Sequence, residues 1–268
     1  MTDIALVVSD IDGTLVTDDK ALTPATVAAV ARLGRAGIGF TVVSSRPPVG
    51  LRAIARQLDI RLPMGAFNGA TLVAPDGAVL SETRLAAPVA RAAAAHLLRA
   101  GVDVWVFANG AWNLRDPDAP YADLEARTLP TGPTVVEDLD PLLEAASKIV
   151  GVSRESDRLA AIEEELAREL GTQAAIHRSQ RYYLDVTPLG FDKGAFLDRI
   201  AERVGVTRER VAAIGDGAND TAMFARAGLA IAMGNASDAV KARAARTTSG
   251  NDADGFAQAM DAFVIGGT

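Results

Sequence analysis

The stretch Asp10-Ile11-Asp12-Gly13-Thr14-Leu15 is the most informative part of the sequence, because it places two carboxylates two residues apart at the end of an apolar run. That run, Ile4 to Val8, predicts a buried strand. Without a counterion, two packed carboxylates would repel and one would become protonated. The stretch therefore predicts a strand whose end faces a metal ion or a phosphoryl group, and Gly13 allows the backbone to turn closely past that group.

Length and composition describe an ordinary soluble protein. The chain has 268 residues, 49% hydrophobic and 23% charged, which is enough for one large domain or two smaller ones. A net charge of -7 without a basic cluster argues against a nucleic-acid partner. Because the sequence has no cysteine, no membrane-length apolar run and no signal-peptide pattern, we expect a cytoplasmic protein without a membrane partner.

The first third of the chain alternates predicted strands and helices, as a parallel sheet requires. Thr23 is the predicted N-cap of the first helix, and Pro75-Asp76-Gly77 predicts a hairpin turn. The other expected elements are a helix over 24–37, a strand over 38–43 ending at Ser44-Ser45-Arg46, a helix over 49–58, and a strand over 64–67 ending at Asn68-Gly69.

The alternation changes near residue 85 and resumes after Pro188. Between these points we expect helices over 88–100 and 162–170, a strand over 102–107, an irregular segment over 116–133, and a hairpin of 173–177 and 181–186 that turns at Ser179-Gln180. After them we expect helices over 194–204 and 220–227 and strands over 211–214 and 229–232. The sequence thus predicts an α/β fold: a doubly wound parallel-sheet core of residues 1–83 and 188–268, with an α+β domain inserted over 84–187.

Three later groups of polar residues follow predicted core strands, where open α/β sheets bind ligands. Ser44 can donate its hydroxyl to a phosphate oxygen or cap the next helix. Lys193, one of only four lysines, is a point charge for phosphate or a solvated residue at a helix start. Asp216 and Asp220 stand among glycines and suit Mg²⁺, although a turn could use the same residues for geometry alone.

Together these groups resemble the four ordered motifs of the haloacid dehalogenase superfamily of phosphohydrolases. The motifs are Asp10 to Leu15, Ser44, Lys193 and Gly215 to Asp220. The insertion resembles the C2 (IIB) cap of the Cof-type group, as do Phe67-Asn68-Gly69-Ala70 and Ala232-Met233-Gly234-Asn235-Ala236. Where that group shows Thr-Gly-Arg, this chain has Ser44-Ser45-Arg46, which leaves open whether Ser44 or Ser45 binds phosphate.

The resemblance implies a role for each motif residue. Asp10 would be the nucleophile, and Asp12 the acid and then the base. Lys193 and Mg²⁺ would shield the phosphate, with the ion held by Asp10, the Asp12 carbonyl and Asp216, and with Asp220 in support. Phosphate and substrate contacts would come from Ser44, Gly13, Ser45, Arg46, Asn68, Gly69 and Asn219.

Substrate choice is expected to lie in the insertion, because the core motifs contact only the phosphoryl group. Alternation along 102–107 puts Trp105 and Phe107 on one face of a strand, opposite three valines. In the hairpin, Arg181, Tyr183 and Asp185 share a face. We expect these mixed faces to overhang the active site and Arg181 to contact substrate, with Trp105 and Phe107 as plain core residues the alternative.

The predicted function is a Mg²⁺-dependent phosphatase that hydrolyses small phosphate monoesters, such as sugar phosphates, through an aspartyl phosphate. Its partner would be a small phosphorylated metabolite. A phosphomutase is the alternative and would return the group to a bound sugar. A signalling receiver ranks last because it has no use for an inserted cap. The sequence does not decide the physiological substrate, or between a monomer and a homodimer.

Overall fold

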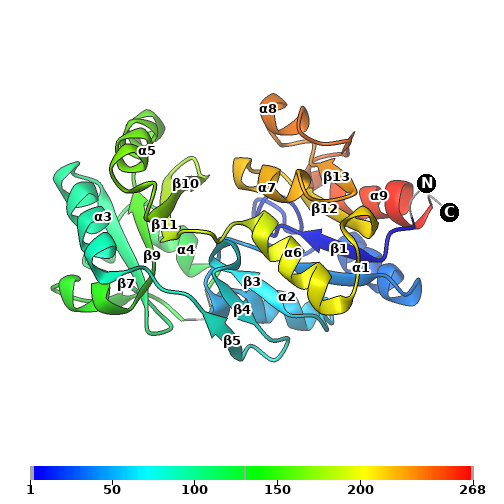
Figure 1. Cartoon of the computed structure of the whole chain (residues 1–268), viewed down its shortest axis with the longest axis horizontal. Helices are drawn as coiled ribbons and strands as arrows, with labels where there is room; N and C mark the ends of the chain where they lie inside the picture. Colours follow the sequence, from blue (N-terminus) through cyan, green and yellow to red (C-terminus); the bar gives the residue numbers. More distant parts are fainter. Residues whose placement is uncertain (1–2, 130, 267–268) are drawn as a thin grey trace.

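A computed structural model describes residues 3–129 and 131–266. It has two lobes, each built on its own sheet (Figure 1). The core lobe holds a parallel five-stranded sheet in the order β14-β13-β12-β1-β2. Its strands are β1 (Leu6–Ser9), β2 (Gly39–Val42), β12 (Val211–Gly215), β13 (Leu229–Ala232) and β14 (Arg246–Thr247).

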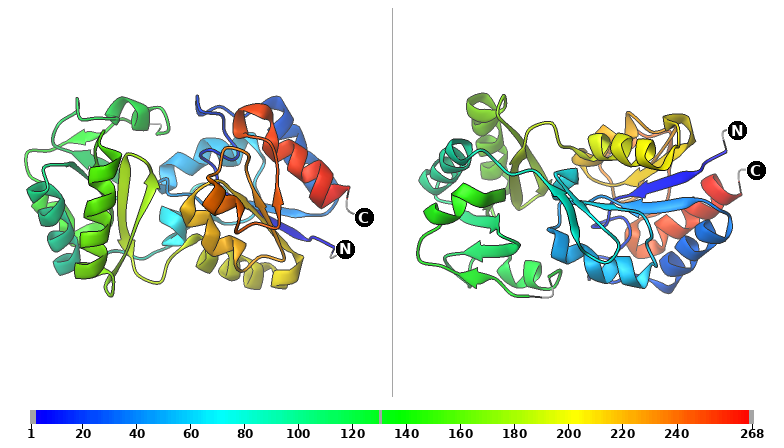
Figure 2. Two further views of the ribbon diagram at one scale, coloured as in Figure 1. Left: turned by 90° about the horizontal axis from the view of Figure 1, so that it is seen from above. Right: turned by 60° about the horizontal axis from the view of Figure 1, so that its bottom comes forward.

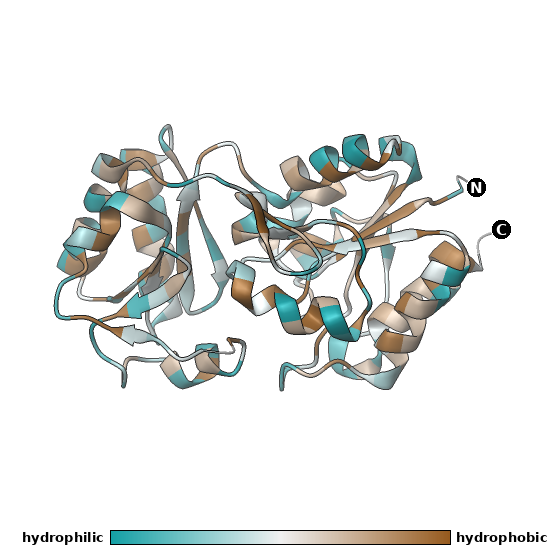
Figure 3. Ribbon diagram, turned by 90° about the horizontal axis from the view of Figure 1, so that it is seen from below, coloured by the Kyte–Doolittle hydropathy of each residue, from teal (hydrophilic) through white to brown (hydrophobic). Residues whose placement is uncertain are grey.

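Helices cover both faces of this sheet, which explains why its main strands are almost continuously apolar. On one face pack α1 (Pro24–Arg35), α2 (Arg52–Gln57) and α9 (Gly255–Ala259), and on the other α6 (Lys193–Val204), α7 (Thr221–Phe224) and α8 (Asp238–Lys241). Figure 3 shows brown, hydrophobic core strands among helices of mixed brown and teal. The predicted α1 is confirmed, with the Thr23 side chain accepting from Thr26 N.

A small antiparallel sheet of β3 (Met64–Ala66), β4 (Thr71–Val73) and β5 (Val79–Glu82) adjoins the core sheet. A parallel bridge between Val43 and Gly65 joins it to the chain just after β2. The predicted hairpin between β4 and β5 is confirmed, with Gly77 at φ +92° in its turn. β3 thus brings Asn68 to the edge of the core sheet where β2 ends.

The cap lobe is a six-stranded sheet in the order β10-β11-β9-β6-β7-β8, visible apart from the core in both views of Figure 2. Its strands are β6 (Asp103–Ala108), β7 (Ala111–Leu114), β8 (Thr134–Val135), β9 (Ala146–Val152), β10 (Ala174–Gln180) and β11 (Tyr183–Pro188). Helices α3 (Ala87–Arg99) and α5 (Ser156–Leu170) cover one face, and α4 (Ala122–Ala126) packs with the aromatic residues of the other.

Short helices complete the chain: η1 (Pro48–Leu51), η2 (Phe67–Gly69), η3 (Asp140–Ala145), η4 (Arg208–Arg210), η5 (Ala218–Asp220), η6 (Asn251–Ala253) and the π-helix Met260–Ile265. Within the described residues no helix is long and apolar enough to cross a membrane. The strands of the cap sheet fall between residues 103 and 188. We retain 84–187 as the proposed cap domain; the outer bounds of the proposed core, 1 and 268, lie outside the described residues.

Four sequence predictions need correction. The helix predicted over 162–170 is α5, which begins earlier, at Ser156. The hairpin turns at Arg181-Tyr182 and not at Ser179-Gln180, because β10 continues through a register shift as far as Gln180. The segment 116–133, predicted to be irregular, contains α4, although Pro130 lies outside the described residues. The predicted helix over 220–227 is η5 followed by α7, which ends at Phe224.

Candidate active site

Three neighbouring strands deliver the predicted motif residues to one edge of the core sheet. β1 lies between β12 and β2. Asp10 directly follows β1, Asp216 directly follows β12, and Ser44 comes two residues after β2. One carboxylate oxygen from each of Asp10, Asp216 and Asp220 lies within 4.8 Å of the other two. Acidic loops more than 200 residues apart in sequence therefore form one cluster.

Lys193 is the cation of this cluster. Its side chain is 1% exposed, and Nζ lies 2.8 Å from Asp10 Oδ1 and 2.6 Å from Asp220 Oδ1. Burial alone would lower the pKa of Lys193, but the two carboxylates outweigh it and raise the pKa. Lys193 is therefore charged and buried, and the alternative of a solvated residue at the helix start is wrong.

One ammonium does not balance three carboxylates. Burial raises the pKa of Asp10, and the charges of Asp220 and Asp216 add to this effect while Lys193 opposes it. Burial and the neighbouring Asp220 raise the pKa of Asp216 to about 7. The site thus disfavours its own negative charge. Such an excess of hard oxygen ligands fits a divalent cation such as Mg²⁺.

Hydrogen bonds and one glycine fix the acidic loops. Thr14 Oγ1 donates to Asp216 Oδ1 at 3.0 Å. Asp220 Oδ2 accepts from the amides of Asp216 at 2.9 Å and Gly217 at 2.7 Å. Gly13 has φ +77°, and a Cβ there would lie 2.3 Å from Asp216 Oδ2. Only a glycine allows this approach of the two loops.

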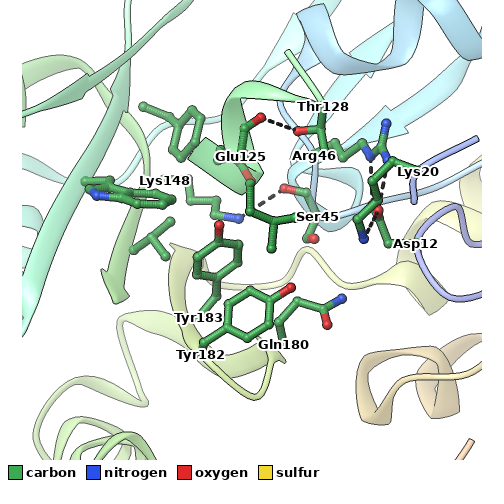
Figure 4. A pocket seen from close by; sticks show the side chains of 14 residues that line it. Asp12, Lys20, Ser45, Arg46, Glu125, Thr128, Lys148, Gln180, Tyr182 and Tyr183 are labelled. Atoms are coloured by element: carbon green, nitrogen blue, oxygen red, sulfur yellow. Dashed lines mark hydrogen bonds and ion pairs between the residues drawn. The ribbon is translucent and has the colours of Figure 1, made fainter. Parts of the chain in front are cut away.

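Asp12 points toward two cations instead of the acidic cluster. Arg46 Nε lies 2.7 Å from Asp12 Oδ2, and Lys20 Nζ lies 2.8 Å from Asp12 Oδ1 (Figure 4). Burial would raise the pKa of Asp12, but Arg46 and then Lys20 outweigh it and lower the pKa. Arg46, predicted to contact substrate, thus pairs with Asp12 in this structure.

The serine loop lies beside the loop of Asn68. Ser44 is fully buried, and its Oγ accepts from the Arg46 amide at 3.2 Å. Asn68 N donates to the Ser44 carbonyl at 2.8 Å. Asn68 and Gly69 have φ of +57° and +100°, so this loop is held in a left-handed conformation. Ser45 lines a pocket between the lobes.

A chain of side chains joins the core to the cap. Asn219 Nδ2 lies 3.2 Å from Asn68 Oδ1, and Asn68 Nδ2 lies 2.7 Å from His177 Nε2 on β10. In this arrangement the Asn68 amide donates to a neutral His177 nitrogen. Asn68 and Asn219, both predicted as substrate-binding residues, therefore contact each other, and His177 joins them from the cap.

Figure 4 shows the pocket that the two lobes enclose. Trp105, Phe107 and Tyr183 line it, so the predicted mixed faces of β6 and β11 do face the core site. Trp105 and Phe107 are also buried in an aromatic cluster. They are therefore core residues of the cap and line the pocket as well. Arg181 is exposed at the hairpin turn and does not line this pocket, whereas Tyr182 does.

Sequence reasoning missed Lys20 and Lys148, and it left His177, beside Arg178, outside the expected site although a substrate contact was considered for it. Lys148 Nζ donates to Asp185 Oδ2 at 2.7 Å and to the Ser45 carbonyl at 3.1 Å. The scarcity of lysine was the available signal, since three of the four lysines lie at this site. No pattern in the sequence marks His177.

The sequence profile of haloacid dehalogenase-like hydrolases matches residues 7–260. The chain belongs to this family. It is 32% identical over 228 residues to the HMP-PP phosphatase of Cronobacter sakazakii, covering 85% of this chain and 83% of that protein. It is 28% identical over 273 residues to a 5-amino-6-(5-phospho-D-ribitylamino)uracil phosphatase of Bacillus subtilis, covering 96% and 97%.

A comparison with solved structures agrees with the family match. A solved structure named as a subclass IIB sugar phosphatase of the superfamily superposes with a TM-score of 0.84 at 24% identity, covering 98% of this chain and 100% of that one. The likeness to this solved structure is a likeness of fold. The family match and the similarity to named phosphatases confirm the predicted Cof-type phosphohydrolase. The likeness to the solved structure confirms the predicted fold, a doubly wound core with an inserted cap.

Proposed function

We propose that this protein is a Mg²⁺-dependent phosphatase that hydrolyses small phosphate monoesters through an aspartyl phosphate on Asp10. The observation that carries the proposal is the cluster of Asp10, Asp216 and Asp220, in which buried Lys193 contacts Asp10 and Asp220. It combines a nucleophile, a cation and a surplus of oxygen ligands where two neighbouring strands, β1 and β12, end.

Asp10 attacks phosphorus and displaces the alcohol, and water then hydrolyses the aspartyl phosphate to regenerate the carboxylate. Lys193 holds Asp10 Oδ1 at 2.8 Å and reduces the repulsion between this carboxylate and an incoming phosphate. Ser44 Oγ accepts from the Arg46 amide, and in the described residues the Ser44 hydroxyl donates to no acceptor. It can therefore donate a hydrogen bond to a phosphate oxygen.

Asp12 protonates the leaving alcohol and later deprotonates the attacking water. In its present ion pairs it is ionised and cannot act as an acid, because Arg46 and Lys20 hold both of its oxygens. Substrate binding must therefore release Asp12. The phosphate is a competing anion for Arg46, whose planar fork suits it.

Mg²⁺ would be held by the carboxylates of Asp10 and Asp216 and by the Asp12 carbonyl. Asp220 supports the site, because its two oxygens already accept from Lys193 and from two backbone amides. When bound, the ion neutralises negative charge on the phosphoryl oxygens.

The substrate is a small phosphorylated metabolite in this proposal. The relatives are named for two chemically different organic phosphates, so the family match does not by itself select one. The pocket wall mixes aromatic rings with the charged side chains of Glu125 and Lys148 (Figure 4). This mixture suits a polar organic group such as a sugar. We further propose that the enzyme acts in the cytoplasm, as a monomer or a homodimer.

A phosphate-release assay over a panel of phosphate esters tests the function. Wild-type protein is expected to release phosphate with Mg²⁺ and to stop when EDTA is added. Asp10→Asn is expected to lose activity by at least about 10³-fold while staying folded. Asp19→Asn is the matched control, since Asp19 is exposed on the same loop. Activity that survives Asp10→Asn or EDTA would refute the proposal, and an isomerised ester without free phosphate would indicate a phosphomutase.

A further inference from the structure

Lys148 is a buried cation that the cap lobe extends into the phosphate site. It lies on β9 and its side chain is only 6% exposed. Its Nζ donates to the backbone carbonyl of Ser45 in the core at 3.1 Å, the contact drawn in Figure 4. Lys148 takes no part in the phosphoryl-transfer steps proposed for Asp10, Asp12, Ser44 and Lys193. A buried ammonium that crosses from one lobe to the backbone of the other requires an explanation.

Its position is fixed from two sides. Asp185 on the neighbouring strand β11 accepts from Nζ at 2.7 Å and is itself fully buried. The Phe107 ring centroid lies 5.6 Å from Nζ. Because a buried charge must be paired, Asp185 holds the ammonium in one place. The cap sheet therefore presents a fixed cation to the Ser45 carbonyl.

The Ser45 carbonyl is connected to the Ser44 side chain through one peptide group. It belongs to the same peptide group as the Arg46 amide, which donates to Ser44 Oγ at 3.2 Å. A cation at the carbonyl polarises that peptide group and strengthens its N–H as a donor. This accepted bond orients the Ser44 hydroxyl, whose proton has no acceptor in the described residues and can donate to a phosphate oxygen. In the described residues, no hydrogen bond uses the Ser45 amide, which remains available to the same anion.

We propose that Lys148 is a positioning residue of the phosphate site, which orients the Ser44 hydroxyl through the Ser45–Arg46 peptide group. The proposal rests on the proposed phosphatase function. It means that the cap contributes to binding the phosphoryl group, and not only to choosing the organic part of the ester. Ser44 is fully oriented only when the cap places Lys148 against the core.

A double-mutant cycle with Ser44 tests whether Lys148 acts through the Ser44 hydroxyl. Lys148→Met with Asp185→Asn removes both charges together, so neither is left buried and unpaired. Measured as kcat/KM for p-nitrophenyl phosphate with Mg²⁺, this pair is expected to lose on the order of 10- to 100-fold, the usual size for a hydrogen bond to a charged group. In a Ser44→Ala background the same pair should lose less than about 3-fold, because the group it orients is gone.

The matched control removes another ion pair of the cap, Arg91 with Glu144, as Arg91→Met with Glu144→Gln. It is expected to leave kcat/KM unchanged. Equal losses in the Ser44 and Ser44→Ala backgrounds would overturn the proposal, and so would no loss in either. If the charge-removing pair does not fold, Lys148→Gln takes its place, because it keeps a donor near Asp185, with the same expected results.

A second readout separates this proposal from the function itself. Binding of inorganic phosphate with Mg²⁺ present, measured by calorimetry, should weaken in the charge-removing pair and in Ser44→Ala, and no further in their combination. If the wild type released no phosphate from any ester, the proposed function would fail, and the calorimetric cycle would still decide the role of Lys148. Additive weakening would overturn that role even in an active enzyme.

Discussion

Gly13 and Asp216 show at the scale of single residues how closely the two acidic loops approach. A Cβ on Gly13 would meet Asp216 Oδ2 at 2.3 Å, and φ is +77°. Gly13→Ala is expected to displace that carboxylate, to weaken Mg²⁺ binding, and to lower the free energy of unfolding by about 1–3 kcal/mol. Mg²⁺ titration by calorimetry and urea denaturation measure the two effects.

The control for this prediction is Gly37→Ala. Gly37 has a similar φ of +73°, but a Cβ there would have nothing within 4 Å. We expect it to lower the free energy of unfolding through backbone strain while leaving Mg²⁺ affinity unchanged. Equal Mg²⁺ affinities for Gly13→Ala and wild type would contradict the close approach of the loops.

His177 makes stability depend on pH. Burial lowers its pKa; Lys148 and Lys193 act in the same direction, and Asp185 and Glu163 oppose them. In the unfolded chain His177 has its ordinary pKa of about 6.5, which is higher than its pKa in the folded protein. The contribution of His177 to the free energy of unfolding should therefore decrease as pH falls from 6.5 toward the folded pKa, whereas Asp10 and Asp216, whose pKa values are raised, change the free energy in the opposite direction.

Urea denaturation at pH 7.5 and 5.5 measures this effect. On going from pH 7.5 to 5.5, the free energy of unfolding of His177→Gln should change more favourably than that of the wild type. His96, Asp10 and Asp216 stay in both proteins, so their contributions cancel in the comparison. An identical change in the two proteins would contradict a buried neutral His177.

Residues whose chemistry is encoded locally were predicted from the sequence. Asp10 and Asp216 directly follow apolar strands, and Lys193 begins a helix, so each stands out within a short window. Lys148 and His177 are different, because each acts by contacting a loop of the other lobe. Such a contact forms only when the two lobes have folded against each other. It joins residues far apart in the sequence, so no short stretch of sequence predicts it.

At the scale of elements, Thr23 joins the start of α1 to the C-terminal part of the chain. Its Oγ1 accepts from Thr26 N at 3.1 Å and donates to Asp254 Oδ1 at 2.7 Å. Thr23→Ala should therefore lower the free energy of unfolding by about 1–2 kcal/mol. Thr23→Ser keeps the hydroxyl and should retain most of the stability of the wild type. Urea denaturation measures both variants. Equal stability of Thr23→Ala and wild type would show that the cap does not stabilise α1.

The elements that the sequence did not predict lack a periodic signal. β9 is buried throughout although it contains Ser147 and Lys148, so its apolar run is interrupted. α4 has five residues and follows Tyr121 at φ +64°, and one turn of helix is too short to show a 3.6-residue period. The long elements α1, α3 and α6 were predicted within a few residues.

At the scale of the whole molecule, the pocket belongs to neither lobe alone. Arg46 and Lys20 reach it from the core, and Tyr182, Glu125 and Lys148 from the cap. The sequence predicted both lobes and the face of each that carries polar and aromatic residues. The closed arrangement, in which Lys148 contacts Ser45, depends on how the lobes meet, and the sequence pattern does not determine it.

The charge imbalance of the acidic cluster should appear in the stability of the entire protein. Asp10, Asp216 and Asp220 repel one another in the folded state, and Lys193 offsets only part of this. A cation that binds only the folded state stabilises it by about 2.7 kcal/mol at 100 times its Kd. Mg²⁺ should therefore raise the thermal unfolding midpoint of the wild type by several degrees.

Asp216→Asn should stabilise the metal-free protein and weaken its stabilisation by Mg²⁺, because it removes one of the repelling charges together with a metal ligand. Without metal its unfolding midpoint should be above that of the metal-free wild type, and added Mg²⁺ should raise it much less. Asp19→Asn, at an exposed site, should behave as the wild type in both conditions. Calorimetric scans with EDTA or Mg²⁺ compare the three proteins. Equal stabilisation of wild type and Asp216→Asn by Mg²⁺ would exclude Asp216 as a ligand, because the ion would then bind elsewhere.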